Sequence, residues 1–217
     1  MNRKVLSYRG IGFAVLFLTS MAAAFSQAQA QEPLPAQSVS SQELETLTTY
    51  YYKDPQPGKA LSAFKNILSQ EELIKDTSHF YPVAHLFATI AHNDANFLSA
   101  LKTLSAEFTG TRKDALGFII RDAQDFVSPE ATTPANLDAL WAEFIATGDI
   151  APVKKIIKVL GYPNTGMGML LIGAAEWSLA SNAQQHEIIL SLIQEEAKTA
   201  QGPIKTRLDK ILGEVGK

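Results

Sequence analysis

Apolar side chains that recur at helical spacing constrain this chain more than any other feature of its sequence. Val83, Leu86, Phe87 and Ile90 stand at positions i, i+3, i+4 and i+7, which lie on one face of an α-helix. No segment shows the confident alternation of polar and apolar residues that is typical of a strand, although the Thr and Tyr residues of 47–52 would suit one. Comparable helical stripes occur in 97–104, 116–120, 137–144, 153–160 and 204–215.

Residues that begin or end helices separate these stripes. Ser40 and Glu43 have the spacing of a capping box, in which each side chain satisfies the backbone N–H of the other, and Ser69 and Glu72 have it again. Thr133-Pro134 predicts a helix start because proline at the first helical position lacks only an N–H that would be unpaired anyway. Four turns within helical hairpins are predicted at Asp54, Asp94, Asp149 and Asn182.

The sequence therefore predicts an all-α fold of about ten short helices, joined by tight turns into hairpins. Stacked hairpins would form a divergent α-solenoid-like domain. The four turns are not evenly spaced along the chain, whereas a regular repeat would keep its period. An irregular helical bundle is therefore the alternative.

The first thirty residues have the pattern of an export signal. Arg3, Lys4 and Arg9 precede an apolar run over 10–25, and Ala28-Gln29-Ala30 offers small residues at a cleavage site. The run is shorter than the ~20 residues of a membrane span, although an uncleaved membrane anchor is the alternative. We expect a signal peptide at 1–30 that is removed near Ala30, a flexible leader at 31–39, and a single helical domain at 40–217. The protein would then be periplasmic or secreted.

Composition narrows the classes of partner. The chain has 19 basic and 22 acidic residues, and three of the basic ones lie in the predicted signal. The charges are dispersed, so a clustered basic surface for nucleic acid or anionic lipid is not expected. Cysteine is absent, which excludes both disulfides and a lipid-modified cysteine. A second apolar stretch, 167–175, is too short to span a membrane, and we expect it to be a buried core helix.

Several strings of residues resemble an uncharacterised family of exported all-helical proteins of proteobacteria. These strings are Leu137-Asp138-Ala139-Leu140-Trp141-Ala142-Glu143-Phe144, Ala146-Thr147-Gly148-Asp149 followed by Val153 and Ile156-Ile157, Glu176-Trp177-Ser178-Leu179-Ala180-Ser181-Asn182-Ala183 with Gln185-His186, and Tyr51-Tyr52 followed by Pro55 and Pro57. The resemblance covers most of the mature chain and implies a periplasmic or secreted helical protein. It implies no activity, ligand or functional residue.

The four histidines do not form a metal-binding pattern. His85 and His92 lie opposite the apolar stripe of their helix and point the same way, but seven residues of helix separate them by ~10 Å, too far for one ion. No HExxH or similar spacing occurs, and Gly166-x-Gly168 meets neither nucleotide-binding fingerprint. We therefore predict no metal and no cofactor, and we expect His85 and His92 to lie on a solvated polar face.

Catalytic motifs are also missing, although two serines and a histidine lie close together in the sequence. The chain has no thiol and no G-x-S-x-G motif. Ser178, Ser181 and His186 are close in sequence, but turn and cap roles explain Ser181 and the neighbouring Asn182 better than a catalytic triad does. An exported hydrolase, with a site assembled from distant residues, is the alternative function.

The most unusual side chains are Tyr50, Tyr51 and Tyr52. Consecutive helical positions point in different directions, so at least one of the three should be exposed, and tyrosine is enriched in binding surfaces. These residues are the predicted binding site. The sequence favours a non-enzymatic scaffold that binds another protein or a peptide, with no nucleic acid partner and no membrane span in the mature chain.

Overall fold

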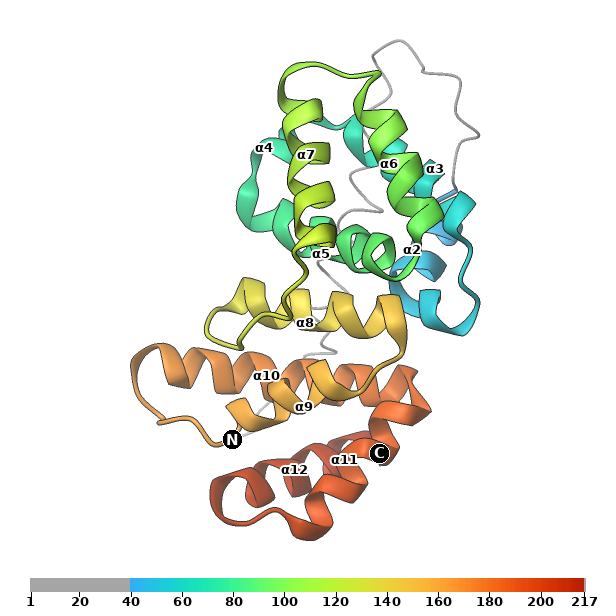
Figure 1. Ribbon diagram of the computed structural model, residues 1–217. Helices are drawn as coiled ribbons and strands as arrows, with labels where there is room; N and C mark the ends of the chain where they lie inside the picture. Colours follow the sequence, from blue (N-terminus) through green and yellow to red (C-terminus); the bar gives the residue numbers. More distant parts are fainter. Residues whose placement is uncertain (1–39, 217) are drawn as a thin grey trace, which may run out of the picture.

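The computed structural model describes residues 40–216, so the predicted signal and leader lie outside the described residues. Within this range the chain is all-α, as predicted, with eleven α-helices, one 3-10 helix and no strand (Figure 1). The segment 47–52 is helical too. The elements are α2 (Ser41–Tyr50), η1 (Tyr51–Lys53), α3 (Pro57–Leu68), α4 (Glu71–Lys75), α5 (Thr77–Asn93), α6 (Ala95–Ser105), α7 (Gly110–Gln124), α8 (Pro134–Thr147), α9 (Ala151–Val159), α10 (Gly166–Gln185), α11 (Glu187–Thr199) and α12 (Gly202–Val215).

Most of the predicted helix boundaries are confirmed at the level of single hydrogen bonds. Ser40 and Glu43 form the full capping box at the start of α2. The Thr133 hydroxyl accepts the backbone N–H of Asn136 at the start of α8, and the Asp94 carboxylate caps α6. Gly148 ends α8 with φ of 73°, a left-handed conformation that glycine adopts without a steric penalty.

Two predicted boundaries are wrong. Ser69 does not open a helix, because its hydroxyl donates to the Asn66 carbonyl at the end of α3. Asn182 is not a turn residue: it is buried inside α10, and its side-chain amide donates to the Ser178 carbonyl one turn earlier. The apolar stripe continues past Asn182, so packing extends the helix to Gln185, and the break falls at His186. Tertiary packing has overridden a local preference for a turn.

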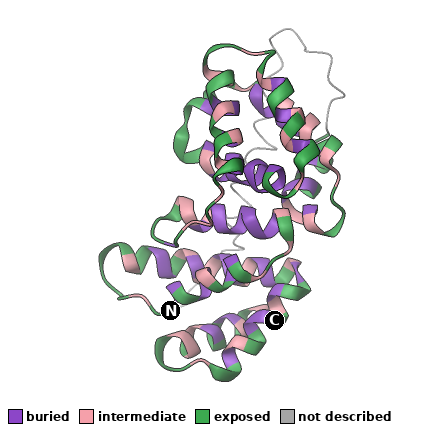
Figure 2. Cartoon of the chain, viewed as in Figure 1, coloured by how far each residue is buried: buried purple, intermediate pink, exposed green. Residues whose placement is uncertain are grey.

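Helix α5 is the centre of the N-terminal half. It packs against α7 on one side and α8 on the other, with α4 and α6 also in contact. No Asp, Glu, Lys or Arg occurs between Thr77 and Asn93, and a helix without a charged face is suited to burial all round. Figure 2 shows α5 and α8 as the most continuously buried part of the molecule.

The C-terminal half is layered below α8. Helices α8 and α9, α9 and α10, α10 and α11, and α11 and α12 are each in contact. Figure 1 shows α9 and α10 together beneath α8, and α11 and α12 together beneath them. In a solenoid, each helix contacts mainly the helices that precede and follow it in the sequence. Here η1 also contacts α8, although the two are far apart in the sequence. The regular stacking of hairpins therefore remains a prediction. Within residues 40–216, no helix combines the length and the hydropathy needed to cross a membrane.

Candidate functional site

The three predicted binding tyrosines lie where α2 passes into η1, and they are more covered than we expected. Tyr51 is buried, and Tyr50 and Tyr52 are half-buried. The Tyr52 hydroxyl lies 3.0 Å from Nδ1 of His186, and the Tyr50 ring packs on the same imidazole with a centroid distance of 5.1 Å. The tyrosines therefore form the wall of a cluster around His186, a residue 134 positions away from Tyr52 in the sequence.

His186 occupies an aromatic environment at the break between α10 and α11. Its side chain is fully buried, and the Phe144 ring meets it edge to face at 5.5 Å. Burial, together with the nearby positive charge of Lys53, lowers the pKa of His186 to about 4. The imidazole is therefore neutral near pH 7 and carries a hydrogen on one ring nitrogen only. Nδ1 shares a hydrogen bond with the Tyr52 hydroxyl, and Nε2 has no hydrogen-bond partner among the described residues.

This arrangement differs from the one a serine hydrolase needs. The hydroxyl at His186 is the phenol of Tyr52, while the Ser178 hydroxyl donates to the Ala175 carbonyl of its own helix. A histidine with a pKa of about 4 is also a weak base at neutral pH.

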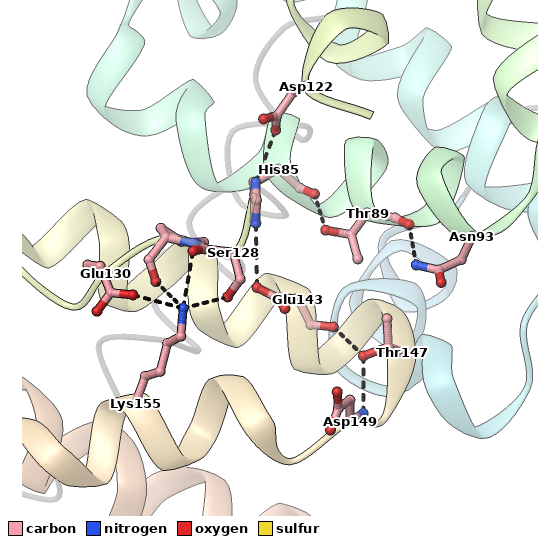
Figure 3. Close-up of polar contacts among 11 residues, drawn as sticks. His85, Thr89, Asn93, Asp122, Ser128, Glu130, Glu143, Thr147, Asp149 and Lys155 are labelled. Atoms are coloured by element: carbon pink, nitrogen blue, oxygen red, sulfur yellow. Dashed lines mark hydrogen bonds and ion pairs between the residues drawn. The ribbon is translucent and has the colours of Figure 1, made fainter. Parts of the chain in front are cut away.

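His85 corrects the prediction of a solvated histidine face. Only 1% of its surface is exposed. Its Nδ1 lies 3.0 Å from a carboxylate oxygen of Asp122 on α7, and its Nε2 lies 3.8 Å from a carboxylate oxygen of Glu143 on α8 (Figure 3). The prediction failed because α7 and α8 cover the polar side of α5. The lack of charged residues between Thr77 and Asn93 was the signal in the sequence that this side is buried.

His92 is exposed, as predicted, but its ring is held in place. The Phe126 ring stacks on His85 at 5.4 Å and on His92 at 4.7 Å. The gap of ~10 Å between the two histidines, set by the helix rise, therefore holds a phenyl ring. His92 Nδ1 lies 3.0 Å from the Ala123 carbonyl. The stack fixes the end of α7 and the following loop onto α5.

Opposing effects act on the His85 ring. Burial lowers its pKa, but hydrogen bonding and charge from Asp122 and Glu143 outweigh that effect, so the pKa of His85 is raised. The two carboxylates face different ring nitrogens and so cannot converge on one ion. In residues 40–216, no group of three or more His, Cys, Asp or Glu side chains is placed to hold a metal.

The start of α10 is the largest departure from the predicted core. Leu171, Ile172 and Ala175 are buried as expected. Three side chains of the same stretch instead face solvent: Met167 and Met169, each 53% exposed, and Leu170, 60% exposed. Figure 2 shows the loop that leads into α10 as mostly exposed. This part of the helix has apolar residues on every face, so the periodicity of the sequence does not indicate which face is buried and which is exposed.

Gly173 extends this exposed surface by one turn. A Cβ atom at Gly173 would meet nothing within 4 Å, whereas one at Gly168 would collide with the Pro163 carbonyl. Gly168 is therefore required by the fold of the loop, and Gly173 is not. No charged residue occurs anywhere in 161–175. We call the surface formed by Met167, Met169, Leu170 and Gly173 the α10 ridge.

Comparison with models of known protein families, with curated proteins and with solved structures found no match to this chain.

Proposed function

We propose that this protein is a non-enzymatic module, exported from the cytoplasm, that binds another protein or a peptide through the α10 ridge. The observation that carries the proposal is the exposure of Met167, Met169 and Leu170 within a single turn of helix. Soluble proteins rarely leave large apolar side chains grouped in solvent unless the group contacts a partner. Methionine is enriched in interfaces, where its flexible thioether adapts to varied surfaces.

Gly173 supports a partner that approaches closely. Glycine within a helix destabilises it by roughly 0.5–1 kcal/mol relative to alanine, and the described part of the chain leaves the space above Gly173 open. Because Gly173 has no side chain, the backbone of a partner can approach α10 more closely here than it could if any other amino acid stood at this position. A helix of the partner, packed along the ridge, would fit this shape.

Tyr50 and Tyr52 are the second surface that we propose for binding. Both are half-buried, so each has an exposed edge, and the Lys53 ammonium lies 4.6 Å from the centre of the Tyr50 ring. Because most of their contact area is already used inside the molecule, we expect this surface to contribute less than the ridge.

A matched pair of substitutions tests the proposal. Leu170→Glu places a charge on the ridge, and Val127→Glu places the same charge on another apolar side chain, which is 75% exposed in the loop after α7. Both variants should fold normally, since both positions face solvent. The mature chain, immobilised and exposed to envelope extract, should capture a specific partner that Leu170→Glu loses at least about tenfold, equivalent to 1.4 kcal/mol, and Val127→Glu retains.

Equal capture by the two variants, or no specific partner for the unaltered chain, would overturn the proposal. Sedimentation of the purified chain adds a second measurement. If the chain self-associates and Leu170→Glu alone abolishes the association, the partner is a second copy. Turnover of ester or peptide substrates that is lost in His186→Gln would favour the exported hydrolase instead.

A further inference from the structure

The His85 imidazole joins three helices at the centre of the N-terminal half. It belongs to α5, its Nδ1 meets Asp122 of α7, and its Nε2 faces Glu143 of α8 (Figure 3). The side chains of Asp122 and Glu143 are themselves 23% and 12% exposed. All three groups are therefore largely removed from water, where charge interactions are stronger than at the surface.

Counting hydrogens shows which charge state this geometry favours. A neutral imidazole carries one N–H and can donate to one of the two carboxylates, whereas an imidazolium carries two and can donate to both. His85 Nε2 and Glu143 Oε2 are both buried and lack a hydrogen-bond partner among the described residues, and at 3.8 Å they are within ion-pair distance of each other. Loss of the proton would leave either Asp122 or Glu143 facing a lone pair, which is unfavourable away from water.

Titratable groups face the ring from α5 itself, from α7 and from α8. On α5, Tyr81 lies one turn earlier with its ring centroid 6.0 Å from that of His85, and His92 lies beyond the Phe126 ring. The loop after α7 contributes the uncharged Phe126. The negative charges therefore come from Asp122 of α7 and Glu143 of α8.

We propose that His85 is a proton-dependent clasp, whose imidazolium holds α7 and α8 against α5 and whose deprotonation loosens the C-terminal end of α7 together with the loop 125–132. This loop is the part that should respond, because Phe126 stacks directly on the ring. Its other end is held by Lys155 of α9, whose ammonium bonds the backbone carbonyls of Ser128 and Pro129. The loop therefore connects the His85 ring, in the N-terminal half, with α9 in the C-terminal half.

The sign of the pH dependence follows from the direction of the shift. The pKa of His85 is higher in the folded protein than in the unfolded chain, whose value is near 6.5. Its stabilising contribution is therefore complete below pH 6.5 and is lost as the pH rises through the raised folded value.

Nitrogen NMR of the imidazole rings tests the clasp directly in the intact chain. Both ring nitrogens of His85 should carry hydrogen at pH 6.5, and the titration midpoint should lie above 6.5. In Glu143→Gln and in Asp122→Asn the titration midpoint of His85 should fall. Each pH unit of that fall corresponds to a tenfold loss of proton affinity. A His85 midpoint at or below 6.5 in the unaltered chain would overturn the proposal.

Amide hydrogen exchange separates a clasp from a merely structural contact. After correction for the intrinsic effect of pH, exchange at 121–132 should increase between pH 6 and pH 9, and Glu143→Gln should flatten that dependence. A purely structural contact would change the exchange by the same factor at every pH. His79→Gln is the matched control, because it alters a histidine–aspartate contact at the exposed start of the same helix and should leave the pH dependence at 121–132 unchanged. An equal effect of His79→Gln would also contradict the clasp.

Discussion

His85 and His186 are buried to the same extent, but their neighbours differ in charge. Two carboxylates face His85, while three aromatic rings and the Lys53 ammonium surround His186. Burial by itself lowers the pKa of both rings, because desolvation disfavours the charged form. Only at His85 are there negative groups to reverse that effect, so the pKa of His85 is raised while the pKa of His186 is lowered to about 4.

The difference predicts opposite dependences of stability on pH. The pKa of His186 is lowered in the fold, so its contribution is complete above pH 6.5 and is lost as the pH falls toward about 4. The contribution of His85 is lost in the other direction, as the pH rises above 6.5. The stabilising contributions of both residues are complete together only near pH 6.5, and each residue can be replaced separately.

Replacing each histidine by leucine should show the largest contrast. His85→Leu leaves the buried Glu143 carboxylate and the partly buried Asp122 carboxylate without a positive partner, which should lower the free energy of unfolding at pH 7 by up to about 3 kcal/mol. His186→Leu removes the hydrogen-bond partner of the Tyr52 hydroxyl and replaces the ring contacts of the imidazole by aliphatic ones, and it should lower the free energy of unfolding by about 1–2 kcal/mol. Urea unfolding of both variants at pH 7 measures the difference.

A double variant checks the cause of that contrast. Glu143→Leu combined with His85→Leu removes one of the orphaned carboxylates and should recover part of the lost stability, so the two changes should be strongly non-additive. If His186→Leu destabilised as much as His85→Leu, or if the double variant were simply additive, charge pairing at His85 would not be the reason for the difference.

The acid side of the comparison is the next largest effect. Between pH 6.5 and pH 4 the unaltered chain should lose up to about 3 kcal/mol through His186, since each pKa unit is worth about 1.4 kcal/mol. Burial also raises the pKa of Asp138 to about 6, and this carboxyl acts in the opposite direction because its folded form prefers to be neutral. Urea unfolding between pH 6.5 and pH 4 should therefore show a steeper fall in the free energy of unfolding for Asp138→Asn than for the unaltered chain. In the double variant Asp138→Asn/His186→Leu, the part of the fall that is due to His186 should be absent. A slope unchanged by His186→Leu would assign the acid loss to other groups.

The helices themselves were predictable because their signals are local. The stripe through Val83 and Leu86, the capping box at Ser40 and the glycine stop at Gly148 each depend on residues within two turns of one another. The contact between Tyr52 and His186 spans 134 positions, and no local pattern encodes it. The sequence pointed to unusual tyrosines but could not indicate which residue they contact.

Two segments that lack Asp, Glu, Lys and Arg differ in how far they are covered. Helix α5 is one of them, and α7 and α8 both pack on it. The segment 161–175 has no charged residue either, yet Met169 and Leu170 are exposed. The periodicity of apolar residues indicates which residues share a face of a helix. It does not indicate how many other helices will pack on that face. For that reason the α10 ridge became visible only in the folded chain.

The smallest predicted effect concerns the hydrogen bond that links the two ends of the aromatic cluster. Tyr52→Phe keeps the ring on Phe144 and His186 and removes only the hydroxyl that is hydrogen-bonded to His186 Nδ1. The free energy of unfolding at pH 7 should fall by about 0.5–1.5 kcal/mol, the usual net value of one hydrogen bond. If the Tyr52 hydroxyl is the donor, its loss frees Nδ1 to accept a proton, so the pKa of His186 should rise in this variant and the acid loss should begin at a higher pH. Tyr50→Phe is the matched control, since Tyr50 contacts the same imidazole through its ring, and it should leave both quantities nearly unchanged. Equal losses from the two variants would mean that ring packing, rather than the Tyr52 hydroxyl, sets the state of His186.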